Sequence, residues 1–337
     1  MGIQLTSLVE GSEITLEDLF GKKIAIDSFN WLYQFLSIIR QADGAPLMDS
    51  RGRTTSHLSG LYYRTIKLLE AGVYPVYVFD GEPPEFKKKT TEQRRNVRAE
   101  AMKEWTKALE RKDYVSAKKY AQRAVTLTGE MIEQSKELLE ALGVPALQAP
   151  GEGEAMCSTM AKQGDVYAVA TQDYDSLLFG APYLVRNLSI TGRKKRGSEY
   201  VIVKPEMLVL NDILEKLGIN RNQLIIIGML IGTDYNPGGV AGFGPKRALE
   251  IVKEKQSLRE VLKEVSWESE VPAEDIYNFF RTPQEAGYNI KFGEIDEEKI
   301  KKIMCDEHDF SEERVMSGLK KLIEAKSKDQ KSLSKWF

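Results

Sequence analysis

Short apolar segments rich in valine and isoleucine alternate along this chain with longer segments of helical periodicity. The apolar segments are residues 24–26, 76–79 and 166–170, with further candidates at 183–186 and 200–203. The helical patterns cover residues 31–40, 56–70, 131–142 and 207–217. Continuous apolar runs are typical of strands buried on both faces. The alternation therefore predicts an α/β fold with a mostly parallel central sheet and helices on both faces.

Acidic residues follow the predicted strands. Asp27 directly follows the first apolar segment, Asp80 follows the second, and Asp173 and Asp175 follow the third. In parallel α/β sheets the carboxyl ends of the strands share one edge, and ligands bind there. A single aspartate at such a point is commonly a helix cap or a turn residue. Because three separate strand ends supply acids, we expect one shared site instead.

Three further acids complete this set. Glu152 and Glu154 stand at a predicted helix start, and Asp234 follows an apolar helix over residues 224–231. Carboxylates gathered in a folded protein repel one another and raise their own pKa values unless cations neutralise them. Oxygen ligands favour hard cations such as Mg²⁺ or Mn²⁺. The seven carboxylates therefore predict a divalent metal site suited to phosphoryl chemistry.

The segment 87–123 is helix-prone and basic. It contains 13 lysine and arginine residues against five acidic ones, although the whole chain has a formal net charge of −2. One interpretation is a solvated helical hairpin with ion pairs along its surface. Its position directly after the acids favours a cover that handles a polyanion and stays mobile until substrate orders it. A second basic tract, residues 192–197, fits either a phosphate-contacting hairpin tip or a solvated turn.

A glycine-rich turn opens a predicted helix after Asp234. Gly242 and Gly244 belong to this turn, and Lys246 and Arg247 lie in the first turn of the helix. Backbone N–H groups at a helix start bind phosphate, and adjacent basic side chains strengthen the attraction. The alternative is an ordinary glycine turn. The basic residues favour a helix–hairpin–helix element that binds the DNA backbone without reading sequence.

The last eight residues, QKSLSKWF, place large apolar side chains after a polar, lysine-rich stretch. Chain ends are usually hydrophilic and frayed, so exposing these groups is unfavourable unless a surface covers them. A tail folded onto its own core is one explanation. Gln330, Leu333, Trp336 and Phe337 also have the spacing of a one-turn helix that presents an apolar plug to a partner.

Composition limits the remaining possibilities. Only Cys157 and Cys305 are present, far apart and without metal-ligand spacing, so we expect a reducing compartment. We expect neither secretion nor a membrane anchor, since no apolar run approaches the roughly 18 residues of a membrane span. Met1-Gly2 followed by Thr6 fits the loose pattern for myristoylation, but no second anchoring signal follows it.

With these motifs the chain resembles the flap endonuclease family of structure-specific 5′ nucleases over essentially all of its 337 residues. The resemblance rests on the seven carboxylates, the opening MGIQL and the terminal Q-x-x-L-x-x-W-F box. It implies a PIN-like 5′ nuclease fold, with a single catalytic domain over residues 1–325. That domain would include a mobile helical arch at about 84–128 and the helix–hairpin–helix element at about 224–256. A flexible tail at 326–337 would carry a box that binds the sliding clamp (PCNA).

The resemblance also implies roles for individual residues. The expected ligands of two Mg²⁺ ions, for which Mn²⁺ can substitute, are Asp27, Asp80, Glu152, Glu154, Asp173, Asp175 and Asp234, with Asp27 and Asp234 partly in the outer shell. Lys87 and Arg94 match the basic pair that contacts the scissile phosphate. The expected DNA contacts are Gly2, Tyr33, Arg40, Thr55, Gly242, Gly244, Lys246 and Arg247, with a K⁺ ion at the hairpin. Tyr33 would stack on the terminal base of the duplex, and residues 54–57 would cradle a one-nucleotide 3′ flap.

The implied function is removal of 5′ flaps at double-flap junctions in DNA replication and repair, which leaves a ligatable nick. A 5′–3′ exonuclease activity at nicks or gaps is expected as well. The nuclease would be monomeric and, as an archaeal-type member, cytoplasmic. Gly151 and Gly153 stand where relatives often carry Ser and Ala, and Glu82 replaces a frequent Lys. None of these departures removes a ligand.

Three other functions fit parts of the sequence. A sister 5′ nuclease, such as an exonuclease or a bubble-cutting repair enzyme, would share the acids. The compact chain and its terminal box argue against relatives with long insertions. A clamp-tethered DNA scaffold without catalysis would not need the carboxylates, and an unused cluster of them costs stability. A metal-dependent ribonuclease of related fold would need neither the hairpin nor the tail.

Overall fold

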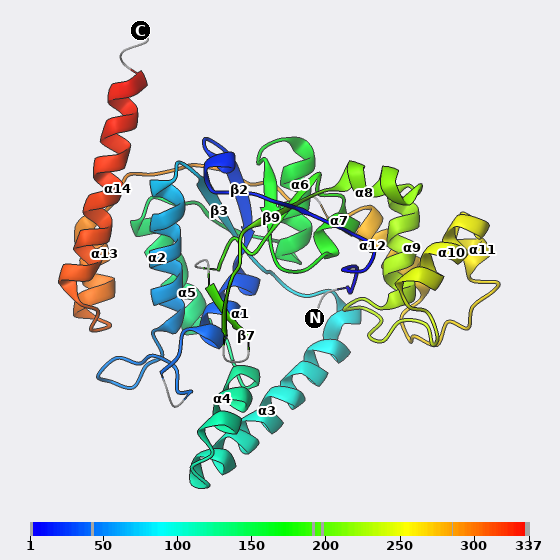
Figure 1. Ribbon diagram of the computed structural model, residues 1–337, viewed down its shortest axis with the longest axis horizontal. Coiled ribbons are helices and arrows are strands. Elements are labelled where there is room, and N and C mark those ends of the chain that lie inside the picture. The colour runs from blue at the N-terminus through cyan, green and yellow to red at the C-terminus, as the bar shows by residue number, and fades with distance from the viewer. Residues whose placement is uncertain (1–2, 42–43, 191–192, 197–198, 285, 334–337) are drawn as a thin grey trace.

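The computed structural model describes residues 3–41, 44–190, 193–196, 199–284 and 286–333 (Figure 1). Within these ranges a central sheet has seven strands in the order β1-β9-β6-β5-β2-β3-β4. The strands are β1 (Ser12–Glu13), β2 (Lys23–Asp27), β3 (Tyr74–Phe79), β4 (Ala146–Gln148), β5 (Ala168–Ala170), β6 (Tyr183–Arg186) and β9 (Glu206–Val209). Neighbours from β6 to β4 run parallel, whereas β9 is antiparallel to β6 and β1. The prediction of a mostly parallel sheet is confirmed.

The strand register brings several predicted site residues to one edge. β2 lies between β5 and β3, and Asp27 at its end pairs with Val78 of β3. Asp80 therefore emerges two residues beyond that pair, and Asp173 lies in the loop after β5. Because all three strands are parallel, these loops leave the sheet at the same carboxyl edge.

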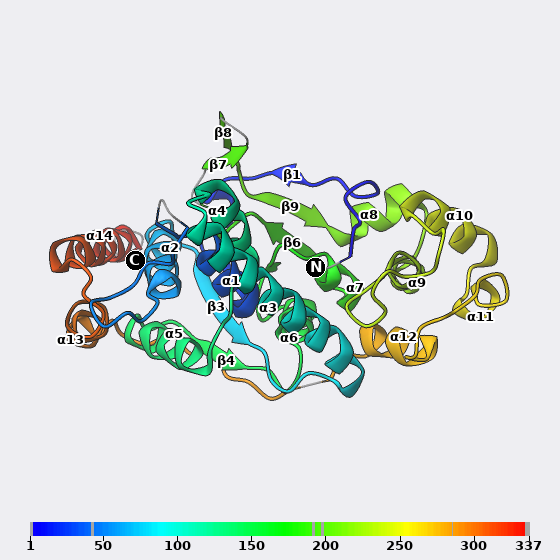
Figure 2. The same cartoon turned by 90° about the horizontal axis from the view of Figure 1, so that it is seen from below.

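Helices cover both faces of the sheet, as predicted (Figure 2). One face carries α1 (Ser28–Ile38), α2 (Ser56–Glu70), α5 (Gly129–Ala141) and α14 (Glu312–Leu333), and the other carries α6 (Gly153–Gln163). Ile24 and Ile26 pack with the first group, whereas Ala25 between them packs with α6. This alternation follows from the two-residue period of a strand. None of the described helices is long and apolar enough to cross a membrane.

A second apolar core lies beside β6 and β9. It is built from α7 (Asp175–Phe179), α8 (Leu210–Leu217), α9 (Arg221–Ile231), α10 (Pro245–Lys255), α11 (Leu258–Val261) and α12 (Ala273–Arg281). The remaining short elements are the 3₁₀ turns η1 (Glu17–Leu19) and η2 (Glu85–Lys87), the hairpin β7 (Arg193–Arg196) and β8 (Glu199–Ile202), α13 (Glu297–Lys301) and the π-helical turn η3 (Lys302–Asp306). The predicted helix–hairpin–helix element corresponds to α9, the loop after it, and α10.

The basic segment forms a pair of helices, α3 (Lys88–Glu110) and α4 (Tyr114–Arg123), that projects away from the sheet (Figure 1). The side chain of Asp113 caps α4 by accepting a hydrogen bond from the Ser116 amide at 3.1 Å. The hairpin buries small residues, including Ala108 and Ala117, rather than large apolar ones. We call α3 and α4 the arch. Its helical nature is confirmed, and its mobility stays a prediction.

Several expected boundaries shift by a few residues, and the strand predicted over residues 200–203 is β8 of the separate β7–β8 hairpin rather than a strand of the central sheet. The helix predicted over residues 207–217 begins only at Leu210, because Met207–Val209 complete β9. A short apolar run fits a strand or a buried helix equally well, and Leu208 pairs with Leu184 of β6 here. At the other end of the chain, α14 continues to Leu333, and the flexibility predicted for residues 326–337 stays a prediction.

An extended strap, residues 286–296, crosses from α12 to α13 along the β4 side of the molecule (Figure 2). Alternate strap residues, among them Tyr288 and Phe292, pack against the α6 face of the sheet. Gly143 at the end of α5 lets the strap pass closely, since its carbonyl accepts a hydrogen bond from the Gly293 amide at 2.9 Å. Gly143 has φ +68°, and a Cβ there would lie 2.4 Å from the Gly293 carbonyl oxygen.

Candidate metal and DNA site

Backbone amides hold two aspartates at the strand ends. Asp27 caps α1 by accepting a hydrogen bond from the Asn30 amide at 3.0 Å. Oδ1 of Asp80 accepts one from the Gly153 amide, at the start of α6, at 2.8 Å. The first bond is a local consequence of β2 running directly into α1, and the second joins the end of β3 to the N-terminus of α6 across 73 residues. Both carboxylates are therefore fixed at the carboxyl edge of the sheet.

The remaining acids enter the edge from helix starts and loops. Glu152 is the N-cap residue of α6, and Oε1 of Glu154 accepts a hydrogen bond from the Ser176 amide at 3.1 Å. Oδ2 of Asp173 accepts one from Asn30 Nδ2 at 3.1 Å. The predicted helix start at the glutamate pair is confirmed.

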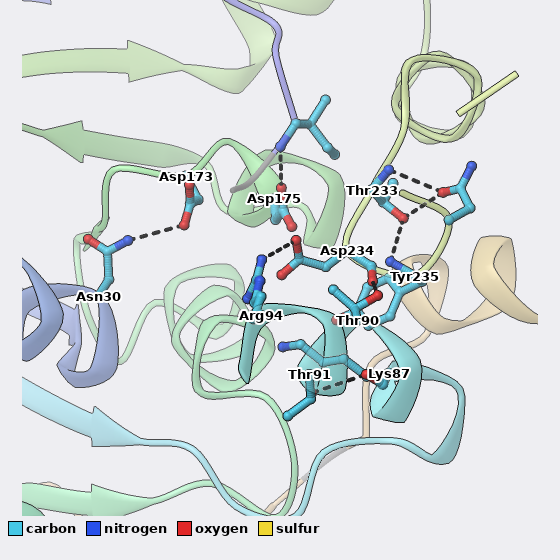
Figure 3. A network of polar contacts seen from close by, with 12 residues as sticks. Asn30, Lys87, Thr90, Thr91, Arg94, Asp173, Asp175, Thr233, Asp234 and Tyr235 are labelled. Carbon is cyan, nitrogen blue, oxygen red and sulfur yellow. Dashed lines mark hydrogen bonds and ion pairs between the residues drawn. The ribbon is translucent and has the colours of Figure 1, made fainter. Parts of the chain in front are cut away.

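The beginning of the chain also reaches this edge. Asp175 is the first residue of α7, and its Oδ1 accepts a hydrogen bond from the Ile3 amide at 3.1 Å (Figure 3). Gly2, which we expected near the site, lies outside the described residues. Its neighbour Ile3 is buried.

Burial and mutual repulsion raise the pKa values of several of these carboxyl groups. Desolvation, with Asp80 nearby, raises the pKa of Asp27 to about 8. Desolvation, with Asp173 nearby, raises the pKa of Asp175 to about 7, and burial beside Glu152 raises the pKa of Asp80 to about 6. Carboxylates in such surroundings favour protonation unless a cation is close. A bound cation would therefore stabilise the ionised forms of these carboxylates.

Two cations from the base of the arch lie at the carboxylates. Lys87 forms an ion pair with Glu152. Nη2 of Arg94 lies 2.5 Å from Oδ1 of Asp234 (Figure 3). The hydroxyl of Thr90 donates to the Asp234 carbonyl at 2.6 Å. Burial alone would lower the pKa of Lys87, but Glu152 and its neighbours outweigh that effect, so its pKa is raised. The predicted basic pair thus meets the predicted acids.

The donor set suits a hard divalent cation in its chemistry, because it consists of carboxylate oxygens whose ionised forms are otherwise disfavoured. As they stand, however, no three or more His, Cys, Asp or Glu side chains among the described residues are arranged to hold a metal ion. Glu152 and Asp234 instead face the two arch cations. The carboxylates therefore suit a metal ion in their chemistry, while Glu152 and Asp234 are paired with Lys87 and Arg94 instead.

Tyr33, the predicted stacking residue, has a cation against its ring. The guanidinium carbon of Arg98, on α3, lies 4.6 Å from the centre of the Tyr33 ring. Arg98 follows Lys87 and Arg94 at helical spacing. Two basic residues of the arch, Arg94 and Arg98, and Lys87 directly before it thus contact groups that we predicted to bind metal or DNA.

The segment predicted to cradle a 3′ flap is mostly buried. Thr55 and Ser56 are buried, and the Ser56 hydroxyl bonds both the Leu47 amide and the Ile39 carbonyl. His57 is fully buried beside Gln134, and desolvation lowers its pKa to about 4. These side chains hold the segment in place. The DNA roles predicted for Thr55 and this segment stay predictions.

Arg40 is used within its own loop, since its Nη1 donates to the Gly44 carbonyl at 2.8 Å. At the predicted hairpin Gly242 has φ +79°, and Gly244 is the N-cap residue of α10. Lys246 and Arg247 are exposed there, and the Arg247 guanidinium packs on the Phe243 ring. The turn and the helix start are confirmed.

The predicted clamp-binding box lies at the C-terminal end of the described residues. Trp336 and Phe337 are outside the described residues. Gln330 and Leu333 fall in the last turns of α14, where the side chains are not described. Gly192 and Gly197, at the two ends of the basic tract 192–197, are also outside the described residues.

Sequence reasoning missed Asn30, Thr90 and Arg98. Asn30 ties Asp27 to Asp173, and a polar residue in the first turn of an apolar helix was the available signal. Thr90 and Arg98 had no comparable signal, because their partners lie far away in the sequence.

Comparison with known proteins identifies the family. Two family models match, the XPG N-terminal domain over residues 1–101 and the XPG I-region over residues 143–234. The flap endonuclease 1 of Thermococcus onnurineus is 55% identical over 341 residues, covering 100% of this chain and 99% of that protein. The chain belongs to the flap endonuclease 1 family. It is therefore a nuclease, a phosphodiester hydrolase.

Solved structures support the family's fold. Flap endonuclease-1 from Methanococcus jannaschii is 42% identical with a TM-score of 0.77, covering 97% of this chain and 100% of that one. The catalytic core of Rad2 in complex with a DNA substrate has a TM-score of 0.72 at 24% identity, covering 96% of this chain and 100% of that one. The second likeness shows the fold alone.

Proposed function

We propose that this flap endonuclease family member hydrolyses the phosphodiester at the base of a 5′ flap in branched DNA during replication and repair. The observation that carries the proposal is the carboxylate edge of the sheet meeting the basic base of the arch. Carboxylates suit hard metal ions, and the arch's positive charge suits a nucleic-acid backbone. The expected products are a released flap and a nick with a 5′-phosphate.

Five carboxylates would hold Mg²⁺, directly or through water, and two would orient water around it. The proposed ligands are Asp80, Glu152, Glu154, Asp173 and Asp175, with Asp27 and Asp234 in the orienting role. Bound Mg²⁺, for which Mn²⁺ can substitute, supplies an activated nucleophile and stabilises the leaving oxygen. In that arrangement Glu152 would face the metal instead of Lys87, and Asp234 would face metal-bound water instead of Arg94. Hydrogen bonds from the Asn30 and Gly153 backbone amides hold the Asp27 and Asp80 carboxylates at the edge.

Lys87 and Arg94 would then contact the scissile phosphate. Lys87 is the last residue of η2 and the N-cap of α3, and Arg94 lies seven residues further along, on α3, so both cations lie within reach of a phosphate at the carboxylates. Positioned cations in a site of limited water stabilise charge that builds up in the transition state. The Lys87–Glu152 and Arg94–Asp234 ion pairs would thus be the arrangement of these groups in the absence of substrate.

DNA shape, rather than sequence, would select the substrate. Tyr33 offers a ring that stacks on any base, with Arg98 exchanged for the base. The exposed Lys246 and Arg247 beside Gly244 support a backbone contact at the start of α10, where K⁺ is a further proposed ligand. The arch would admit the single-stranded flap. A bulky adduct on the flap's 5′ end that leaves cleavage undiminished would argue against this threading.

The tail would recruit a sliding clamp, with the nuclease itself a monomer. Support comes from the box of Gln330, Leu333, Trp336 and Phe337 alone. We also propose action in the cytoplasm, which the two unpaired cysteines Cys157 and Cys305 support. Deleting residues 330–337 should abolish clamp binding in a pull-down and leave cleavage of a naked flap unchanged. Retained binding would contradict the tail's role.

The central test is cleavage of an end-labelled double-flap DNA with Mg²⁺, with chelator, and by the Asp175→Ala variant. We expect one dominant product, cut near the junction, that both controls abolish. Asp212→Ala is the matched control, because Asp212 is an exposed aspartate on α8 that is not one of the seven predicted carboxylates. Tight DNA binding without cutting under any divalent metal would overturn the catalytic proposal and favour a scaffold.

A further inference from the structure

Phe86, at the base of the arch, packs on a cluster of aromatic rings next to the carboxylate edge. We call this cluster the aromatic pocket; its rings are those of Tyr235, Phe279, Phe280 and Phe179. Its ring centre is 5.3 Å from that of Tyr235 and 5.4 Å from that of Phe279, both in edge-to-face geometry. Tyr235 directly follows Asp234, and Phe279 belongs to α12. The pocket therefore joins the arch to elements about 150 and 190 residues further along the chain.

The pocket does not need Phe86 for its own packing. Tyr235 and Phe279 contact each other at 4.9 Å, and both contact Phe280 or Phe179 behind them. Tyr235 and Phe280 are almost fully buried, whereas Phe86 is only partly buried. Removing the Phe86 ring therefore leaves a pre-formed aromatic wall and releases the segment that was docked on it.

That segment is the short connection between Asp80 and Lys87. Its first residue is fixed, since the Gly81 amide donates to the Gly151 carbonyl at 2.7 Å. Its last turn is closed by the Lys87 amide, which donates to the Pro84 carbonyl at 2.9 Å. Between these points no other large apolar side chain is available, because the intervening sequence is Glu-Pro-Pro-Glu. Phe86 is thus the large apolar side chain that docks this segment on Tyr235 and Phe279.

Lys87 is the next residue, and its placement depends on this anchor. Its Nζ lies 5.9 Å from the centre of the Tyr235 ring, the same ring that Phe86 packs on, and it pairs with Glu152. We propose that Phe86 is a positioning residue for phosphodiester cleavage, whose ring fixes the Lys87 ammonium at the carboxylate edge. This inference rests on the catalytic role proposed above for Lys87.

The first test compares Phe86→Ala and Phe86→Leu with wild-type enzyme on the double-flap DNA. Phe86→Ala should lower kcat by about 10- to 100-fold with KM changed less than about threefold, as expected when a transition-state contact is misplaced. Phe86→Leu, which keeps apolar bulk in the pocket, should recover most of the loss. Phe292→Ala is the matched control, since Phe292 packs edge-to-face on Tyr74 at 5.6 Å on the strap. It should leave kcat unchanged.

A double-mutant cycle with Lys87→Ala separates positioning from general stability. If Phe86 acts through Lys87, adding Phe86→Ala to Lys87→Ala should lower kcat less than about twofold further. Independent, multiplying losses would overturn the proposal. If Lys87→Ala alone retains wild-type kcat, the proposed role of Lys87 fails instead, so the two failures are distinguishable.

A measurement without DNA or metal completes the test. Hydrogen exchange of the Lys87 amide should be at least about tenfold faster in Phe86→Ala, because the turn it closes loses its anchor. Amides of α6 should keep their wild-type rates. Unchanged exchange at Lys87 together with unchanged kcat would show that Phe86 only fills space.

Discussion

Replacing Lys87 by methionine should destabilise the protein in chelator far more than in Mg²⁺. The Lys87 and Glu152 side chains are only 14% and 10% exposed, so solvent screens their ion pair weakly. Breaking a buried pair typically costs about 3–5 kcal/mol. We take the lower end, about 3 kcal/mol, because the neighbouring carboxyl groups can take up protons and limit the loss.

The expected change in melting temperature follows from the size of the chain. Unfolding entropy of about 2 cal/mol/K per residue gives roughly 0.7 kcal/mol/K for a chain of this length, so about 3 kcal/mol corresponds to roughly 4 °C. The assay is thermal unfolding followed by circular dichroism, with chelator and with saturating Mg²⁺. Because Mg²⁺ neutralises the same carboxylates, the difference between variant and wild type should fall below about 1 °C when it is present.

Lys107→Met is the control for this experiment. Lys107 pairs with Glu104 on the arch, but the two side chains are 56% and 40% exposed, so its loss should matter little in either condition. A melting-temperature difference for Lys87→Met that is equally large with and without Mg²⁺ would refute the reasoning, since Lys87 would then not share its counter-charge role with the metal.

Two further outcomes are expected. The pKa values of Asp27 and Asp80 are raised to about 8 and about 6. The protonated carboxyl groups therefore stabilise the metal-free fold at low pH. This contribution is lost as the pH rises through those values. The Mg²⁺-induced gain in melting temperature should therefore grow from pH 5 to pH 8, and a constant gain would contradict this. Gly143→Ala should cost about 1–3 kcal/mol in chemical denaturation, because its positive φ and the nearby Gly293 carbonyl exclude a Cβ. Gly164→Ala, also at positive φ but in open space, should cost less.

The sequence was sufficient to predict the carboxylate edge, because a parallel sheet places strand ends together whatever the loops contain. Asp27, Asp80 and Asp173 could be assigned to one edge from local patterns alone. The same local reasoning misassigned Met207–Val209, since a short apolar run is compatible with helix and strand until a partner such as Leu184 selects one.

Pairing across long sequence separations was beyond prediction. Nothing local indicates that Arg94 meets Asp234, 140 residues away, or that Arg98 covers Tyr33. The burial of His57 was also not foreseen, because a histidine in a polar stretch has no signature of a core position. Such contacts depend on how the arch and the helices dock, which is decided by tertiary packing rather than by periodicity.

The packing of α14 on α2 has a consequence for how the chain is made. The Tyr62 hydroxyl of α2 donates to the Val315 carbonyl at 2.7 Å across 253 residues, and Leu319 and Leu322 share the core with Leu58 and Leu61. At about 5–20 residues per second, a ribosome adds those 253 residues in roughly 13–50 s. During that interval the apolar face of α2 lacks its cover, so the nascent chain must remain soluble with one side of its core open. A chain ending at residue 296 should accordingly be cut within α2 by protease concentrations that the full chain resists, and equal resistance would show that this face is covered without α14.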